Sequence, residues 1–273
     1  MIEDPKLDEF FARFAFHLIP FTREIKVKDR FQSVVYDEPL IHLQRTISKS
    51  MSGALIAPAG TGKTALLRAL VASLPEARYR VHYVKVTNLS KKDFPKEIST
   101  AVGAKTSGTF PALVRNIQEC FLYTREADHV QPVLILDEAH GMRPEVLAML
   151  RILTNFEMDS RLVVSIILAG QPELTTILSQ DQLRDVAGRL ACKSTLRLLT
   201  SGEMQEYVKH RCRIAGAPKC PFIAEAMATL FEYTRGNLRA TDRLALKSLE
   251  VAHDQDSDVV AGGHVCDARE MML

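Results

Sequence analysis

Residues 57 to 65 are of the types that bind a polyphosphate. In order they are Ala57-Pro58-Ala59-Gly60-Thr61-Gly62-Lys63-Thr64-Ala65. They fit the pattern G-x-x-x-x-G-K-[ST], except that alanine, which keeps most of the tight packing, stands first. The glycines let backbone N–H groups approach a phosphate closely. Lys63 supplies a charge for the β and γ phosphates and Thr64 a hydroxyl for a metal ion, so these residues predict a site for ATP with Mg²⁺.

A pair of carboxylates follows a second apolar run, residues 133–136. Asp137 and Glu138 stand at its carboxyl end, where side chains of a parallel sheet face the ligand crevice. We expect Asp137 to hold Mg²⁺, directly or through water. We expect Glu138 to polarise the attacking water, since phosphoryl transfer depends mainly on positioning and charge neutralisation. His140 is interpreted as structural, or as a relay to a neighbouring subunit, and is left outside the predicted site.

Apolar runs and helical patterns alternate along most of the chain. Strands are predicted at 53–57, 81–86, 133–136 and 162–169, with helices at 38–51, 63–73, 93–102, 110–126 and 144–155. This order predicts a doubly wound parallel sheet. Beyond residue 201 only helices are predicted, at 201–214, 221–234 and 238–253. We therefore divide the chain into an arm (1–30), an α/β domain (31–200) and a helical domain (201–273).

Composition excludes several classes of protein. The formal net charge of +2 is nearly neutral, so any nucleic-acid surface must come from local clustering. Five cysteines at irregular spacing predict free thiols rather than a disulfide framework or a zinc site. The acidic N-terminus is unlike a signal peptide, and the longest apolar run is too short to span a bilayer. We expect a cytoplasmic protein with no membrane partner.

With both motifs in place, the sequence resembles the AAA+ ATPases along nearly its whole length. Within that class it is similar to the ExeA-like group and to ATPase regulators of DNA transposition of the TniB, TnsC and IstB kind. Besides the two motifs, the resemblance is carried by residues 20–25, 168–174 and 236–239. It implies an AAA+ P-loop domain with a C-terminal all-helical lid.

The resemblance also implies roles for residues outside the two motifs. Gln171 matches the polar residue that senses the γ-phosphate, although a strand-capping turn residue is the alternative. Arg239 matches the lid arginine that reaches the nucleotide, a task suited to a planar, always-charged group. Arg184 and Arg189 lie where such ATPases carry the arginine given to a neighbouring subunit, and we favour Arg189. An arginine of this kind raises the rate by about 10³–10⁵, so assembly would control activity.

A lysine-rich segment is the candidate DNA surface. Lys85, Lys91, Lys92, Lys96 and Lys105 lie within it, beside the hydroxyl and amide donors Thr87, Asn88 and Thr109. Composition alone favours a solvated helix face. The resemblance implies that loops of this region line a DNA channel, and no aromatic platform for single strands is present. We therefore expect duplex DNA to bind with little sequence preference at Lys91, Lys92, Lys105 and Thr109.

The leading interpretation is an ATP-dependent switch that assembles on double-stranded DNA. ATP drives assembly into a ring or a helical filament, the assembly recruits or activates a transposase, and slow, stimulated hydrolysis resets it. The N-terminal arm, rich in phenylalanine, is a candidate partner-binding segment or a packing helix.

Three alternative functions are weighed against this interpretation. An ExeA-type secretion ATPase is expected to carry a transmembrane helix or a peptidoglycan-binding domain. A replication initiator or helicase loader is expected to carry a helix-turn-helix domain after the lid. A metabolic P-loop kinase would leave Arg189 and Arg239 without a task. The sequence shows none of the additional segments that these alternatives call for.

Overall fold

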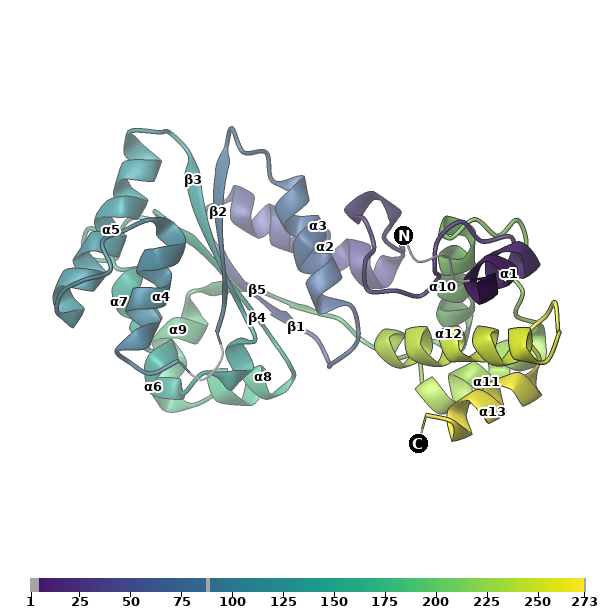
Figure 1. The fold of residues 1–273 in the computed structure, drawn as a ribbon. Coiled ribbons are helices and arrows are strands. Elements are labelled where there is room, and N and C mark those ends of the chain that lie inside the picture. The colour runs from purple at the N-terminus through teal and green to yellow at the C-terminus, as the bar shows by residue number, and fades with distance from the viewer. Residues whose placement is uncertain (1–4, 87–88, 273) are drawn as a thin grey trace. The chain divides into compact units, whose positions relative to one another are not determined.

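The computed structural model describes residues 5–86 and 89–272, which form two compact units. The sheet unit comprises residues 34–59 and 63–196. The helical unit comprises the described residues of 1–33, 60–62 and 197–273. The sheet unit is therefore inserted in sequence between two parts of the helical unit, and Figure 1 shows the elements of each. The predicted arm, 1–30, groups with the C-terminal helices.

Among the described residues, parallel strands form a sheet with the order β2-β3-β4-β1-β5. The strands are β1 (Ser52–Ile56), β2 (Tyr79–Lys85), β3 (Gln131–Asp137), β4 (Ser165–Gly170) and β5 (Leu190–Thr195). Every residue of β3 and β4 is buried, as expected when helices cover both faces of a sheet. The predicted doubly wound parallel sheet is confirmed.

Strand β5 is the part of the sheet that the sequence did not predict. It lies at the edge next to β1, and half-buried residues alternate with exposed ones along most of its length. It therefore lacks the continuous apolar run of the inner strands. Two predicted elements also differ from the structure. β4 begins at Ser165 rather than at residue 162, because its pairing with β3 starts there, although Val163 and Val164 are buried. The helix predicted at 144–155 is divided into two short helices.

Helices cover both faces of the sheet, with α2 (Val34–Ser48) and α3 (Lys63–Ser73) on one face and α4 (Asp93–Val102) and α5 (Phe110–Glu126) on the other (Figure 1). The shorter helices are α6 (Pro144–Leu147), α7 (Met149–Leu153), α8 (Glu173–Leu178) and α9 (Arg184–Gly188). Phe94, Ile98 and Phe121 are almost completely buried in a core shared with the inner strands. This packing fixes the strand ends that carry the candidate site.

The helical unit consists of α1 (Pro5–Phe14), α10 (Ser201–Ile214), α11 (Ala224–Thr234), α12 (Leu238–Asp254) and α13 (Gly262–Glu270), with a 3₁₀ turn at Val27–Asp29. α1 packs against α12, where the buried Phe10 ring meets His253 edge-on with centroids 5.8 Å apart. The His17 N–H donates to Ala215 O at 2.7 Å. The phenylalanines at 10, 14 and 16 thus belong to an internal aromatic cluster.

A buried arginine joins three segments of the helical unit. Arg211 donates to Thr22 O at 2.7 Å and to the Tyr207 hydroxyl at 2.8 Å, and its guanidinium lies 3.3 Å from Asp242 Oδ2. Burial raises the pKa of Asp242 to about 6, although Arg211 acts in the opposite direction. This cluster holds the N-terminal segment against α10 and α12.

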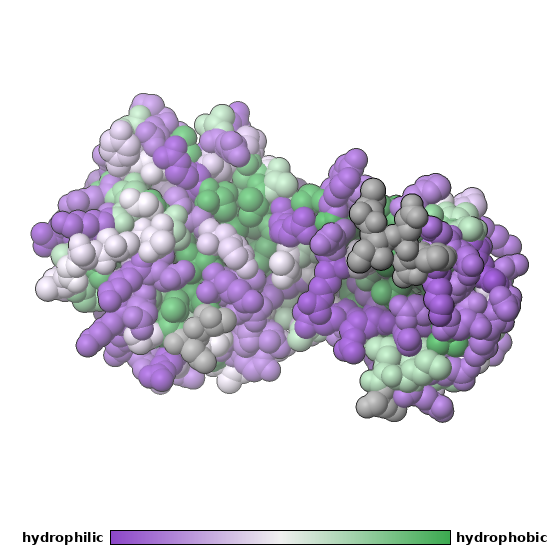
Figure 2. All heavy atoms as spheres, viewed as in Figure 1, coloured by the Kyte–Doolittle hydropathy of each residue, from purple (hydrophilic) through white to green (hydrophobic). Residues whose placement is uncertain are grey.

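The hydropathy of the surface and the state of the cysteines are those expected from the amino-acid composition. Each unit presents a mostly hydrophilic surface on the face shown in Figure 2. The five cysteines are free, as predicted. Within residues 5–86 and 89–272, no helix combines the length and the apolarity needed to cross a membrane.

Candidate nucleotide site

The Gly-rich loop lies between the end of β1 and the start of α3. Gly60 and Gly62 have φ angles of 78° and 92°, in the left-handed region that glycine adopts without steric cost. Ala57, the residue that departs from the usual pattern, is fully buried, and its N–H donates to Gly170 O at 2.9 Å. Its methyl group is therefore accommodated at the start of the loop. The strand–loop–helix arrangement is the one that the phosphate-binding motif requires.

Lys63, the first residue of α3, points at the two acidic residues that end β3. Its Nζ atom lies 2.6 Å from Asp137 Oδ1 and 2.5 Å from Glu138 Oε1. Lys63 and Asp137 are both buried, whereas the Glu138 side chain is 30% exposed. The structure therefore brings together the three charged residues that the sequence placed in one site.

Asp137 is held by three hydrogen-bond donors. Besides Lys63, the Glu138 N–H donates to Oδ1 and the Tyr83 hydroxyl donates to Oδ2, each at 2.8 Å. Partial burial and the bond to Asp137 raise the pKa of Tyr83 above its ordinary value. Sequence reasoning missed Tyr83, which lies in β2, the strand paired with β3. These contacts fix the Asp137 carboxylate at the edge of the sheet.

Glu138 occupies a backbone conformation that is uncommon for a residue with a side chain. Its φ angle of 61° lies in the left-handed region, and such strain concentrates at functional sites. His140 Nε2 lies 3.6 Å from Glu138 Oε2 and 2.8 Å from the Gln171 amide nitrogen. Gln171 directly follows β4, so it reaches the site through His140. His140 lies outside the site predicted from the sequence. Its position two residues after Glu138 could have indicated that the two side chains lie close together.

The residues present fit ATP with Mg²⁺. Thr64 has an exposed side chain at the start of α3, and Asp137 presents carboxylate oxygens at the end of β3. Hydroxyl and carboxylate oxygens are the ligands that Mg²⁺ prefers. Ala65, in the same turn of α3, is half-buried.

Arg239 and the middle of the Gly-rich loop, residues 60–62, both belong to the helical unit. Arg239 lies in the first turn of α12, and its backbone N–H donates to Gly60 O at 3.1 Å. Asn237 caps this helix by accepting from the Ala240 N–H at 3.1 Å. A Cβ atom at Gly60 would lie 2.4 Å from Asn237 Oδ1, so the contact requires glycine. The segment 236–239 thus contacts the loop through its backbone.

Comparison with known proteins places this geometry in a known fold. A family model described as an AAA domain matches residues 45–178. The ORC1 protein of Aeropyrum pernix in complex with DNA has a TM-score of 0.69 at 16% identity, covering 94% of this chain and 70% of that one. For the RuvB Holliday junction branch migration motor of Thermotoga maritima, the TM-score is 0.59 at 18% identity, with 88% and 69% covered. This chain has the AAA+ P-loop fold.

A curated relative extends the AAA+ comparison to sequence. General secretion pathway protein A of Aeromonas hydrophila is 28% identical over 250 residues, which are 90% of this chain and 45% of that protein. The chain thus spans less than half the length of this relative. Together, the matches support an AAA+ ATPase, a class that uses nucleotide, and they support ATPase activity in general.

The two arginines considered for a neighbouring AAA+ subunit differ in their surroundings. Arg189 donates to Thr154 Oγ1 at 2.7 Å and to Asp159, and its side chain is 26% exposed. The side chain of Arg184 is 82% exposed and pairs only with the equally exposed Asp181 among the described residues. The structure therefore shows Arg189 engaged within its own chain and Arg184 at the surface.

The four predicted DNA-contacting residues lie on the surface of the sheet unit. Lys91 and Lys92 precede α4, Lys105 follows it, and Thr109 is the residue before α5; all four are exposed. Ser90 donates to Asp93 at the start of α4 and orders this turn. Thr87 and Asn88, named with this group, lie outside the described residues. The lysines are thus available to a ligand at either end of α4.

Proposed function

We propose that this protein is an ATP-dependent AAA+ switch that assembles on double-stranded DNA and regulates or recruits a transposase for target selection. The observation that carries the nucleotide part is the contact of Lys63 Nζ with both Asp137 and Glu138. A cation and two carboxylates within hydrogen-bond distance at the end of a phosphate-binding loop are the parts that phosphoryl transfer needs. The DNA and transposase parts rest on the exposed lysines and on the sequence resemblance.

Different residues of the chain would bind the phosphates of ATP, hold Mg²⁺ and activate the attacking water. The N–H groups of the Gly-rich loop and the Lys63 ammonium would bind the phosphates. Mg²⁺, held by Thr64 and Asp137, would neutralise phosphate charge. Glu138 would orient and polarise the attacking water, while His140, which accepts from the Gln171 amide, lies beside Glu138 on its other side. Arg239 would approach the nucleotide from the helical unit.

ATP binding would change the partners of Lys63. The ammonium bonds two carboxylates, and a γ-phosphate would compete for the same donors because charge-assisted bonds to phosphate are strong. Glu138, the more exposed partner, would be the one released. Its release frees a carboxylate to act on water, so nucleotide binding prepares the site for hydrolysis.

Assembly would complete the site. An arginine from a neighbouring subunit stabilises transition-state charge in ATPases that hydrolyse slowly alone. Arg189, favoured from the sequence, would have to leave Thr154 and Asp159 to serve this role, whereas Arg184 is already at the surface. Self-association as a ring or a helical filament is therefore part of the proposal.

DNA contact would come from Lys91, Lys92, Lys105 and Thr109. Exposed lysines and a hydroxyl suit the phosphate backbone and read no sequence. The ORC1 protein in complex with DNA shares the fold and serves as an analogy for this role, because a fold by itself does not fix a function.

A second candidate is a secretion-associated ATPase of the ExeA type. The observation that favours it is the 28% identity to general secretion pathway protein A. The sequence shows no transmembrane helix and no peptidoglycan-binding domain, but the match covers only 45% of general secretion pathway protein A. The lack of such segments therefore does not distinguish a secretion-associated ATPase from a regulator of transposition.

Fluorescence anisotropy of a labelled random-sequence duplex tests the proposal. The protein is titrated without nucleotide, with ADP and with a non-hydrolysable ATP analogue. We expect tight, salt-sensitive binding with the analogue alone. No binding in any nucleotide state would contradict the DNA proposal and would favour the secretion-associated candidate.

A further inference from the structure

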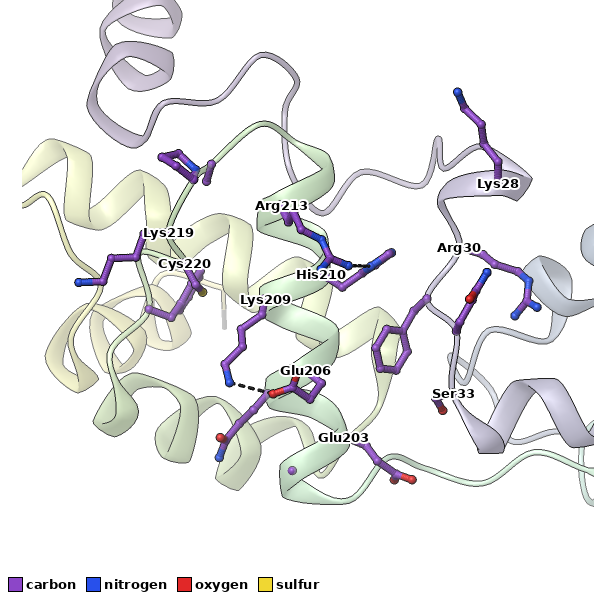
Figure 3. A pocket seen from close by; sticks show the side chains of 17 residues that line it. Lys28, Arg30, Ser33, Glu203, Glu206, Lys209, His210, Arg213, Lys219 and Cys220 are labelled. Carbon is purple, nitrogen blue, oxygen red and sulfur yellow. Dashed lines mark hydrogen bonds and ion pairs between the residues drawn. The ribbon is translucent and has the colours of Figure 1, made fainter.

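A wide groove lies wholly within the helical unit, and none of the residues assigned above lines it. It has a volume of about 1350 Å³ and is lined by three segments: residues 28–33, the exposed face of α10, and the loop at 217–222 (Figure 3). The loop follows α10, and the segment 28–33 comes from the other end of the chain. The groove therefore exists only where the two parts of the helical unit meet.

The lining of the groove is strongly basic. Five lysine and arginine residues face two glutamates, and His210 adds a titratable ring; the cations are Lys28, Arg30, Lys209, Arg213 and Lys219. The chain as a whole has a net charge of only +2. This local excess of positive charge is the clustering that a nearly neutral protein needs to bind a polyanion.

The two glutamates are already engaged by other groups. Glu203 pairs with Arg197 at 2.7 Å and closes the N-terminal cap of α10 with Thr200. The bonds from Arg197 and Thr200 lower the pKa of Glu203 to about 2, although desolvation opposes them. Glu206 pairs with Lys209 at 2.8 Å (Figure 3). Neither carboxylate is positioned to neutralise the remaining cations.

Three of the remaining cations are exposed, and one of these three is held in place. Within the part of the chain that the structure describes, Lys28, Arg213 and Lys219 form no ion pair with a carboxylate. Arg213 donates to His210 Nδ1 at 3.1 Å, and His210 Nε2 in turn donates to Asp29 O at 2.8 Å. This chain of bonds holds the guanidinium between α10 and the segment 28–33 and leaves its other N–H groups for a ligand.

The aromatic residues of the groove are packed against neighbouring side chains or buried. Phe31 packs edge-on against Tyr207 and tilted against His210, with centroids 5.5 Å and 5.6 Å apart, so its ring belongs to the wall. Phe222 is buried. Because these two rings are already packed into the protein, they form no open pocket for the apolar anchors on which protein partners depend. A phosphate backbone needs spaced, exposed cations and no anchor.

We propose that this groove binds the phosphate backbone of double-stranded DNA through Lys28, Arg213 and Lys219, as a contact surface separate from the lysines near α4. The inference rests on the proposed DNA-binding function and adds a second location for it. Backbone contact by both units would make DNA affinity depend on the helical unit as well as on the sheet unit.

The test compares two triple variants of the full chain by anisotropy with the ATP analogue. The groove variant is Lys28→Gln, Arg213→Gln, Lys219→Gln. The matched control removes the same charge from the helical unit outside the groove: Arg243→Gln, Lys247→Gln, Arg269→Gln. For the groove variant we expect a loss of affinity of about tenfold or more and a salt slope smaller by up to about 2.7. We expect the control to bind like the wild type.

A charge-conserving variant distinguishes a loss of DNA affinity caused by lost charge from one caused by misfolding. Lys28→Arg, Arg213→Lys, Lys219→Arg should restore the affinity. Nucleotide affinity and the thermal unfolding midpoint of the groove variant and of the charge-conserving variant should equal those of the wild type, because the three side chains are exposed. As a second readout, acetylation of the wild type should be slower with DNA present at Lys28 and Lys219 but not at Lys247.

The outcomes distinguish the inference from the function on which it rests. Wild-type binding with an unchanged groove variant, or with unprotected Lys28 and Lys219, would overturn the groove alone and leave the proposed function standing. No wild-type binding in any nucleotide state would overturn both. A groove variant that loses affinity for a labelled polyglutamate peptide but keeps affinity for DNA would show that the groove binds an acidic protein instead.

Discussion

The sheet unit and the helical unit each bury a cation beside an aspartate that accepts from a tyrosine. In the sheet unit these residues are Lys63, Asp137 and Tyr83; in the helical unit they are Arg211, Asp242 and Tyr207. The two clusters share their chemistry and differ in what surrounds them. Lys63 ends a loop with left-handed glycines and also contacts the partly exposed Glu138. Arg211 instead uses its donors on a backbone carbonyl and on buried side chains.

Because of this difference, Lys63 can exchange its carboxylate partners for a ligand, whereas Arg211 keeps its partners within the fold. A ligand can reach the partners of Lys63, because Glu138 is accessible and the loop N–H groups can bind phosphate. The partners of Arg211 are a backbone carbonyl and two side chains that are buried or mostly buried. On the proposed function, similar side chains would therefore serve binding in one unit and stability in the other. The following predictions test this contrast from the largest expected effect to the smallest.

Arg211→Met is expected to have the largest effect on stability. Removing the guanidinium leaves the mostly buried Asp242 without its cation, with only the Tyr207 hydroxyl donating to it, which costs about 3–5 kcal/mol in the free energy of unfolding. Chemical denaturation measures this loss. Lys63→Met is the matched comparison and should cost less, because Glu138 can be hydrated and the buried Asp137 keeps two donors, the Tyr83 hydroxyl and the Glu138 N–H. Equal losses in the two variants would contradict the contrast.

Lys63→Ala should weaken binding of a fluorescent ATP analogue by about 1,000-fold. The ammonium makes charge-assisted bonds to phosphate worth a few kcal/mol together. Arg68→Ala, in the same helix but outside the loop, is the control and should bind normally. Retained affinity in Lys63→Ala would remove the loop from nucleotide binding.

The stability of the helical unit should depend on pH through Asp242. The folded pKa of about 6 is above the ordinary 3.8, so between these values the folded state holds a proton that the unfolded state has released. The free energy of unfolding should therefore fall by up to about 3 kcal/mol as pH rises from about 4 to about 6. Denaturation at a series of pH values measures the slope, and Asp242→Asn should flatten it. A rise in the free energy of unfolding over this range would contradict a pKa of Asp242 raised by burial.

Glu138→Gln should keep ATP binding and lower hydrolysis by about 100-fold, as expected when a group that activates water is removed. Phosphate release under single-turnover conditions measures the chemical step. Glu173→Gln, an exposed change of the same type, is the control. Hydrolysis at the wild-type rate would exclude Glu138 from the mechanism.

Tyr83→Phe should have the smallest effect, a loss of about fivefold to tenfold in hydrolysis, because one hydrogen bond worth about 1 kcal/mol is removed. The loss should be seen mainly as a higher Mg²⁺ concentration at half-maximal rate, since Tyr83 positions Asp137. Tyr79→Phe in the same strand is the control. A change in rate with no change in Mg²⁺ dependence would contradict a positioning role.

The sequence predicted the charged site because its residues are tied to element ends. Lys63 starts a helix, and Asp137 and Glu138 end a strand, and in a parallel sheet these ends meet at one edge. Tyr83 was not predictable in this way, because its contact with Asp137 depends on β2 lying next to β3. The hydrophobic periodicity of a single strand does not determine the order of strands in a sheet. The engagement of Arg189 with Asp159 likewise depends on how a distant loop returns to the domain. Strand β5 was missed because an edge strand need not be continuously apolar.

The division of the helical unit into two distant segments has a consequence for synthesis. Residues 5–33 leave the ribosome long before residues 197–272, on which α1 and the 28–33 segment pack. The sheet unit between them is contiguous apart from residues 60–62 and can fold first, as earlier domains do during translation. Until α10 and α12 emerge, the apolar face of α1 has no partner, so the nascent chain presents three phenylalanines to chaperones. Residues 5–33 can therefore pack only after residues 197–272 have been synthesised, and the basic groove that both segments line forms last.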